Sequence, residues 1–184
     1  VKEGKVLPGN IIKVDGFLNH RIDTELMDHI AEEFGKHFNM DEVTMILTAE
    51  ASGIALSAIV AQHYHKPMIF AKKAKSDNIE GGLYQSDIFS YTYKKKVTLL
   101  VSKEWISSDD KVLIIDDFMA NGEAMRGLCD IVKAAGATLV GIGCAVEKGF
   151  QGGGDRLRAA GVNLKSLAII ESAEPGNIVF RDED

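Results

Sequence analysis

The sequence predicts an α/β fold: a largely parallel, twisted sheet flanked by helices. Short apolar runs, often rich in β-branched residues, alternate along the chain with segments of helical periodicity. Right-handed crossovers between such strands cover both faces of the sheet. A length of 184 residues suits one domain with a sizeable core, and no repeat or linker divides it. We therefore expect a single domain over residues 1–184.

Local signals place the elements of the first half. After an extended N-terminal segment, Asp23 or Thr24 is a suitable N-cap for a helix whose apolar residues recur at helical spacing as far as Phe38. The elements expected next, in order, are a strand over 43–48, a helix over 54–64 and a strand over 68–71.

The second half repeats this cycle. A buried strand begins at Val112 and is expected to end at the acidic pair Asp116-Asp117. A helix over 123–135 follows, and Gly136 suits its C′ position. The remaining elements are a strand over 138–146, a short helix over 151–160 closed by Gly161, and a strand over 164–170.

The connection after Val112 has the layout of a site for a phosphorylated sugar. The N-terminus of a helix presents unpaired N–H groups and a partial positive charge, which suit a phosphate. The small residues 120–122 let the backbone approach closely, and the carboxylates of Asp116 and Asp117 can accept hydrogen bonds from sugar hydroxyls. An ordinary strand–turn–helix connection with a solvated acidic turn is the alternative.

Ligands of such sheets bind at the carboxyl ends of the strands. This rule gathers four segments around one rim: residues 49–53, 72–73, 116–124 and 147–150. Residues 73–93 interrupt the rhythm of strands and helices with a segment rich in polar residues and aromatics. A loop of this length is typical of a functional lid, and a hairpin without catalytic duty is the alternative.

Charge and composition argue against several classes of protein. The net charge is −6, and the only basic triplet, residues 94–96, fits a solvated face better than a nucleic-acid contact. No apolar run approaches the roughly 20 residues that span a bilayer, and no export signal is evident, so we expect a cytoplasmic protein without a membrane partner. Cys129 and Cys144 are expected to be reduced, buried thiols, and no metal-ligand spacing is present.

Four separated blocks resemble the purine phosphoribosyltransferases. They are residues 13–20, 49–55, 112–124 and 141–150, and the run V-L-I-I-D-D-x-x-A-N-G-x-A resembles that family's motif for phosphoribosyl diphosphate (PRPP). The resemblance is closest to the bacterial xanthine phosphoribosyltransferases. It implies a type I phosphoribosyltransferase fold with a small N-terminal hood (mainly residues 1–22) and a flexible lid loop (about 73–93). The implied reaction moves the 5-phosphoribosyl group from PRPP to xanthine, giving XMP and diphosphate in purine salvage.

The resemblance also implies roles for residues at the rim. Asp116 and Asp117 are the catalytic candidates, because they would hold the ribose hydroxyls and place negative charge near a developing cation. PRPP binding falls to Ala120, Asn121, Gly122, Glu123 and Ala124. Diphosphate binding falls to Glu50, Ala51, Ser52, Gly53, Lys72 and Lys73, although surface lysines are an equal alternative for the last two.

Purine binding is carried over to Ile12, Asn19, Lys148 and Phe150. A lysine donor suits a 6-oxopurine better than adenine, whose amino group is itself a donor. Ala120 stands where many hypoxanthine–guanine enzymes carry an aspartate that can act as general base. Our hypothesis is that xanthine, an acidic purine, can react as an anion and therefore needs less help from a general base.

The resemblance further implies Mg²⁺, carried mainly by PRPP and diphosphate rather than by the protein, and a homodimer. Two alternatives remain open at the level of sequence. One is a sister enzyme that uses guanine or adenine, of which adenine is disfavoured more strongly by Lys148 and Asn19. The other is a PRPP-sensing repressor, which the acidic chain and the few residues before Ile12 disfavour.

Overall fold

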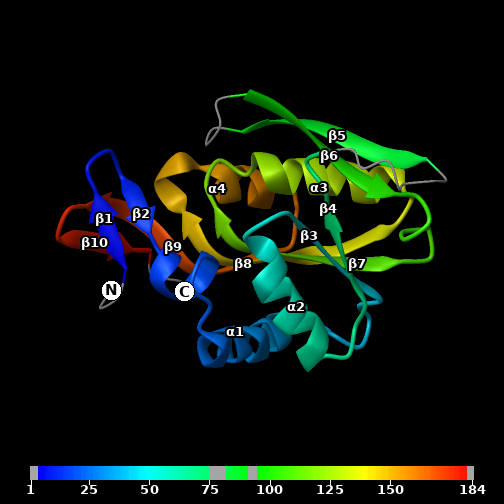
Figure 1. The fold of residues 1–184 in the computed structure, drawn as a ribbon, viewed down its shortest axis with the longest axis horizontal. Coiled ribbons are helices and arrows are strands. Elements are labelled where there is room, and N and C mark those ends of the chain that lie inside the picture. Colours follow the sequence, from blue (N-terminus) through cyan, green and yellow to red (C-terminus); the bar gives the residue numbers. More distant parts are fainter. Residues whose placement is uncertain (1–3, 75–81, 91–94, 182–184) are drawn as a thin grey trace.

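The computed structural model describes residues 4–74, 82–90 and 95–181. Its central sheet has six strands in the order β10-β9-β8-β7-β3-β4 (Figure 1). All neighbouring pairs are parallel except β10 with β9. The predicted α/β class with a largely parallel sheet is therefore confirmed. The strands are β3 (Met45–Ala49), β4 (Met68–Ala71), β7 (Lys111–Met119), β8 (Thr138–Lys148), β9 (Leu164–Glu174) and β10 (Asn177–Phe180).

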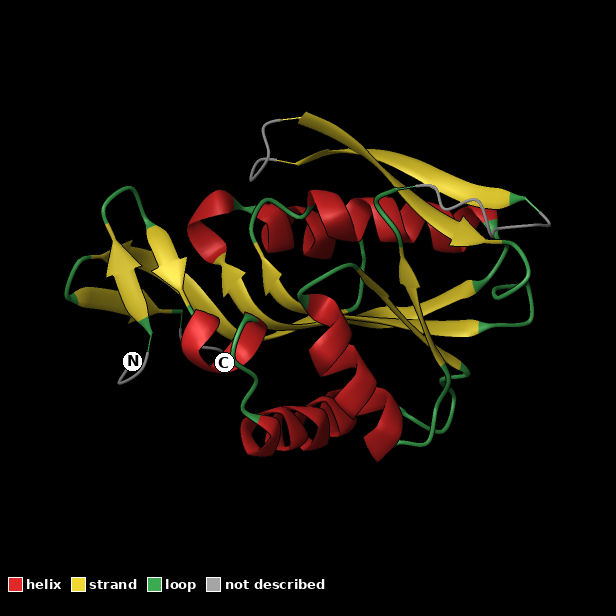
Figure 2. Ribbon diagram, viewed as in Figure 1, coloured by secondary structure: helices red, strands yellow, loops and turns green. Residues whose placement is uncertain are grey.

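Helices cover both faces of this sheet (Figure 2). Helices α1 (Thr24–His37) and α2 (Gly53–His63) pack on one face, and α3 (Glu123–Ala134) and α4 (Gly153–Ala159) lie on the other. Alternate residues of β7 point to opposite faces of the sheet. Leu113 and Ile115 accordingly join the core beneath α1 and α2, while Ile114 joins the core beneath α3.

The helix ends follow the predicted caps. Asp23 is the N-cap of α1, and its Oδ1 accepts a hydrogen bond from Leu26 N at 3.1 Å. Gly136 has a φ of 72° after the end of α3. Its N–H bonds to Lys133 O and the next N–H bonds to Val132 O, which is the Schellman arrangement.

Several strands run further than the sequence predicted, and the extensions of β7 and β9 matter most. β7 does not end at the acidic pair but continues through Asp116 to Met119, because it stays paired with β8 as far as Met119 opposite Glu147. β9 continues to Glu174 and reverses through a turn at Gly176 into the antiparallel edge strand β10. The sequence did not predict β10.

The N-terminal segment forms a small separate unit. Strands β1 (Lys5–Leu7) and β2 (Ile11–Lys13) pair antiparallel, and a π-helical turn, η1 (Asp15–Asn19), follows them. Leu18 is buried against the cluster that contains α1. The unit lies near β9 and β10, at the far end of the sheet from β4 (Figure 1).

Part of the segment 73–93, expected as a lid loop, forms a strand. Strand β5 (Leu83–Ser90) pairs antiparallel with β6 (Lys95–Ser102) along its whole length, as the alternative of a hairpin predicted. Burial explains this, because Ile88 and Leu99 are inserted into the core beside α3. Residues 75–81 and 91–94 lie outside the described residues.

The β5–β6 hairpin sits directly on α3. A Cβ atom at Gly127 would lie 2.5 Å from Ile88 Cγ2 and 2.9 Å from Leu99 Cδ1. Arg126 Nη2 donates to Asp87 O at 2.8 Å, and Ser86 Oγ donates to Asp130 Oδ2 at 2.9 Å. The helix that begins at the rim is thus fixed to the hairpin by close packing and by polar contacts.

Replacing Gly127 should loosen this packing. We expect Gly127→Val to lower the free energy of unfolding by about 1–3 kcal/mol, because the new side chain must push Ile88 and Leu99 aside. Gly16→Val is the control, since an added Cβ there meets nothing within 4 Å. Urea denaturation measures both, and equal stability of the two variants would contradict the packing argument.

Candidate active site

A cavity opens at the carboxyl ends of β3 and β7, beside the N-terminus of α3. Nine predicted site residues meet here: Glu50, Ser52, Lys73, Asp116 and the five residues of the loop 120–124. The rest of the wall consists of Ala49, Ile88, Phe89, Phe118, Met119 and Met125. The structure therefore brings three of the four predicted rim segments to one place.

The loop 120–124 offers its backbone to this cavity. Gly122 is the N-cap of α3 in the left-handed conformation, with a φ of 79° that side chains rarely adopt. Asn121 Oδ1 accepts a hydrogen bond from Glu123 N at 3.3 Å. The N-terminus of α3, with its partial positive charge, thus lines a concave site suited to an anion.

The acidic pair is divided between two environments. Consecutive residues of a strand point to opposite sides. Asp116 lines the cavity, whereas Asp117 is 1% exposed and its Oδ1 accepts a hydrogen bond from Ser52 Oγ at 2.8 Å. Among the described residues, no hydrogen-bond partner reaches Asp117 Oδ2. Of the two acids, Asp116 lines the cavity, while Asp117 ties β7 to the turn before α2.

Burial raises the pKa of Asp116 well above its usual value, and the neighbouring Asp117 raises it further. The carboxyl of Asp116 also accepts a hydrogen bond from Asp117 N at 3.1 Å, which acts in the opposite direction. A buried carboxyl held beside a second acid is costly to ionise. Sugar hydroxyls or a nearby cation would favour its charged form.

The turn after β3 supplies the opposite wall. Glu50 and Ser52 line the cavity, and Lys73 N donates to Glu50 Oε1. Ala51, which follows a cis peptide bond, does not line it. Gly53 also stands behind the wall, where a side chain would collide with the Asp116 carboxylate and the Thr48 hydroxyl.

Lys72 is placed apart from its neighbour Lys73. Its backbone pairs with Leu100 of β6, through Lys72 N to Leu100 O at 2.9 Å. Its side chain borders a different hollow, beside Trp105 on the outer side of β4. The structure thus brings only Lys73 to the cavity that contains the acidic pair.

None of the four predicted purine residues lines the cavity. Lys148 Nζ donates to Asn10 O at 3.3 Å. The same atom lies 5.4 Å from the centre of the Phe118 ring and 6.0 Å from that of Phe150. Burial lowers the pKa of Lys148. Ile12 lies on β2 and Asn19 ends η1, both outside the wall.

Phe118 is a wall residue that the sequence analysis missed. It stands two residues after Asp116 on β7, and both residues line the cavity. Recognising this position required knowing that β7 continues past the acidic pair. Phe118 connects the cavity to Lys148.

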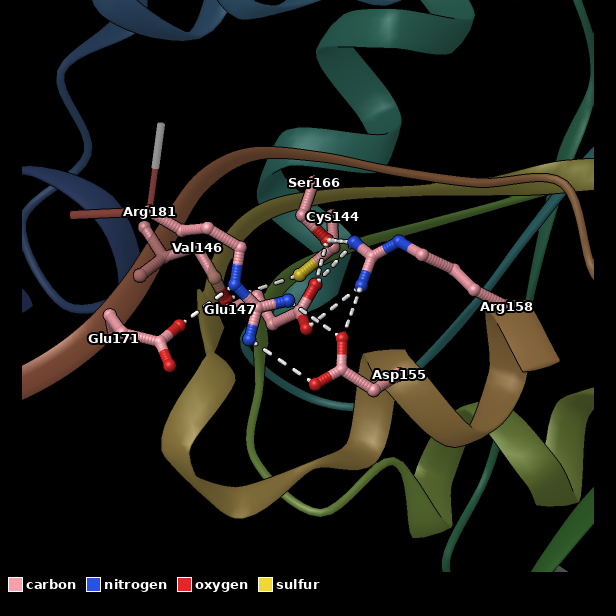
Figure 3. A network of polar contacts seen from close by, with 8 residues as sticks. All are labelled: Cys144, Val146, Glu147, Asp155, Arg158, Ser166, Glu171 and Arg181. Carbon is pink, nitrogen blue, oxygen red and sulfur yellow. Dashed lines mark hydrogen bonds and ion pairs between the residues drawn. The ribbon is translucent and has the colours of Figure 1, made fainter. Parts of the chain in front are cut away.

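A buried ion pair lies behind the loop 120–124 (Figure 3). Glu147 is completely buried, and both of its carboxylate oxygens bind Arg158, at 2.7 and 3.2 Å. Ser166 Oγ also donates to this carboxylate. Arg181 binds Asp155 and Glu171 at the edge of the same network. The sequence signal, an acid inside an apolar strand, went unused in the sequence analysis.

The described residues contain no group of three histidine, cysteine, aspartate or glutamate side chains arranged to hold a metal ion. Glu50 and Asp116 nevertheless place carboxylate oxygens on the cavity wall, and these are donors that Mg²⁺ accepts. The cavity therefore fits a Mg²⁺ ion whose other ligands come from a bound substrate. In the described part of the chain, no helix combines the length and apolar character needed to cross a bilayer.

Comparison with known proteins identifies relatives over nearly the whole chain. The family model of the phosphoribosyl transferase domain matches residues 17–160. A xanthine phosphoribosyltransferase of Bifidobacterium adolescentis is 50% identical over 98% of this chain and 95% of its own length. One of Lachnoclostridium phytofermentans is 50% identical over 99% and 95%.

Solved structures share the fold at lower identity. The adenine phosphoribosyltransferase of Rhodothermus marinus has a TM-score of 0.74 and 21% identity, covering 92% of this chain and 95% of that one. The enzyme of Giardia lamblia, solved with 9-deazaadenine, has a TM-score of 0.71 and 23% identity, covering 81% of each chain.

The raised pKa of Asp116 predicts a pH-dependent effect of Asp116→Asn. The folded protein retains a proton on Asp116 at pH values where the unfolded chain has lost it, so this group's stabilisation fades as pH rises through the folded pKa. An asparagine does not titrate. The Tm of Asp116→Asn relative to the unchanged protein should therefore rise between pH 4 and pH 8.

The exposed Asp109→Asn is the control, and its Tm difference should be flat over the same range. Thermal unfolding followed by circular dichroism measures both variants. A flat difference for Asp116→Asn as well would contradict the altered pKa.

Removing Arg158 should strand the buried Glu147 carboxylate. We expect Arg158→Met to lower the free energy of unfolding by about 3–5 kcal/mol, and Glu147→Gln combined with Arg158→Met to recover part of it. Lys36→Met, which breaks the exposed pair with Glu33, is the control and should have no measurable effect. Urea denaturation of the three variants tests this. A double variant as unstable as Arg158→Met alone would argue against an unpaired buried charge on Glu147.

Proposed function

The chain belongs to the phosphoribosyltransferase family, and we propose that it transfers the 5-phosphoribosyl group from PRPP to xanthine. The products would be XMP and diphosphate, formed in purine salvage in the cytoplasm. One observation carries the proposal: the backbone of the loop 120–124, at the N-terminus of α3, faces the same cavity as the Asp116 carboxylate. A phosphate and a set of sugar hydroxyls are the chemical groups that such an arrangement binds.

The 5-phosphate would lie against the loop 120–124. N–H groups at the start of α3 would bind its oxygens, and the macrodipole of the helix favours their negative charge. Gly122 permits this contact because its left-handed backbone leaves the turn without a side chain.

The ribose would lie over Asp116. Loss of diphosphate makes the anomeric carbon cationic, much as in glycoside cleavage. The buried Asp116 carboxylate would accept hydrogen bonds from the hydroxyls, which favours its charged form, and its charge would stabilise the developing cation. We assign Asp117 a supporting part in the free protein, where it holds Ser52.

The diphosphate would leave towards the turn after β3. Ser52 offers a hydroxyl and Lys73 lines the same cavity, so these side chains suit the leaving group. Mg²⁺ brought in by PRPP, with Glu50 or Asp116 as ligands from the protein, would neutralise charge on the diphosphate. Lys72 supports this role less well, since it borders another hollow.

The base would be held between the cavity and Lys148. The ammonium group of Lys148 would donate to a ring carbonyl oxygen of the purine, beside the rings of Phe118 and Phe150. Ile12 and Asn19 would contact the base only if the N-terminal unit closes towards it as a hood. A lid role for the segment 73–93 and a homodimer stay predictions from the family resemblance.

A sister enzyme using adenine is the second candidate, because the solved structures that share the fold are adenine phosphoribosyltransferases. Lys148 argues against it. A protonated amine has donors only, and the adenine amino group is also a donor, whereas xanthine presents a carbonyl at the same ring position.

Product formation from PRPP and Mg²⁺, with xanthine, guanine, hypoxanthine and adenine tested in parallel, decides the proposal. We expect XMP from xanthine as the dominant product. Lys148→Ala should raise the KM for xanthine about 10–100-fold through loss of a charged donor, with the KM for PRPP nearly unchanged. Gly122→Val should do the reverse. Turnover of adenine alone, or of no base, would overturn the proposal.

A further inference from the structure

Arg156 of α4 reaches back to the loop 120–124. Its Nη2 donates to Asn121 O at 2.9 Å, and its Nη1 donates to Gln151 O at 3.4 Å. The side chain does not line the cavity, and none of the roles assigned above involves it. The guanidinium group of Arg156 thus holds a main-chain carbonyl of the proposed phosphate loop.

The peptide between Asn121 and Gly122 links this contact to the next amide of the loop. In a trans peptide the C=O and the following N–H point in opposite directions. Holding Asn121 O towards Arg156 therefore fixes Gly122 N–H to face away from Arg156. A charged donor on the carbonyl also polarises the peptide, which makes its N–H a stronger donor. Arg156 thus sets both the direction and the strength of one amide of the loop.

Close backbone packing gives this contact its precision. A Cβ at Gly153 would lie 2.5 Å from Asn121 C, 2.6 Å from Ala120 O and 2.7 Å from Gly122 N. The start of α4 therefore rests directly on the peptide planes of the loop. Any larger residue at position 153 would push α4, and Arg156 with it, away from Asn121.

Helix α4 has only seven residues and depends on its surroundings for its position. Two sets of ion pairs fix it to the sheet (Figure 3). The buried Glu147 of β8 holds Arg158, and Arg181 holds Asp155 at 2.7 Å. Gly154 has no room for a side chain against the Glu147 carboxylate. The ion pair behind the loop therefore determines where Arg156 stands.

We propose that Arg156 is a positioning residue for the 5-phosphate: it holds the Asn121 carbonyl so that the Gly122 amide is oriented to bind the phosphate, and the Glu147–Arg158 pair holds α4 in the place that this requires. This proposal rests on the proposed function. Arg156 acts through the loop and makes no contact with the substrate.

Ribose 5-phosphate is the probe that tests this without turnover. Calorimetry gives its Kd, and ¹H–¹⁵N NMR follows the Gly122 amide as it binds. We expect Arg156→Ala to raise the Kd about tenfold, as loss of one charge-assisted hydrogen bond predicts, and to reduce the Gly122 shift at saturation to less than half. Arg156→Lys keeps the charge without the planar fork and should recover only part of both effects.

Lys133→Ala is the matched control, because it removes one exposed positive charge at the other end of α3. It should leave the Kd and the Gly122 shift unchanged. Arg156 and Lys133 are both exposed, so we expect all three variants to stay folded, and their melting curves check this.

Three results would overturn the positioning role. A Kd for Arg156→Ala within twofold of the unchanged protein would remove any role in binding. A raised Kd with the full Gly122 shift would mean that Arg156 acts only as a distant charge. Failure of the unchanged protein to bind ribose 5-phosphate would refute the proposed function itself, and the positioning role with it.

Discussion

The buried carboxyl of Asp116 is the constraint around which the rim is built. It stands near the end of a central strand, beside a second acid and with little access to water, which is an unfavourable place for a charge. The carboxyl of Asp116 is also tightly enclosed. A side chain at position 53 would collide with its oxygens and with the hydroxyl of Thr48. A group so costly to ionise in the free protein is poised for a ligand that supplies hydroxyls or positive charge.

The side of the cavity formed by the loop 120–124 is supported from behind. The loop 120–124 lies between α3, which the β5–β6 hairpin fixes from outside, and α4, which rests on its peptide planes. Glu147 links α4 to the strand next to β7. Because backbone amides have no side chain to readjust, their aim depends on such packing. Support of this kind is a condition for preorganised electrostatic binding.

The turn after β3 is joined to β7 in the free protein by a hydrogen bond from Ser52 to Asp117. This bond is made at the point where the acidic pair lies. The arrangement keeps the proposed leaving-group wall and the proposed ribose wall in a fixed relation before any ligand arrives. Geometry prepared in advance lowers the entropy that binding must overcome.

The sequence by itself determined the α/β class, the succession of the helices α1 to α4 and of the parallel strands β3, β4, β7, β8 and β9, the caps at Asp23 and Gly136, and the family. These depend on periodicity, local capping chemistry and contiguous motifs, all of which are written along the chain. Only the tertiary structure decided that β7 runs past Asp116, that Asp117 bonds to Ser52, and that Lys72 and Lys73 border different hollows. It also decided that the cavity wall includes Phe118 and that Arg156 and Glu147 lie behind the loop 120–124. Each of those outcomes depends on pairing or packing between segments far apart in sequence, so no local pattern encodes it.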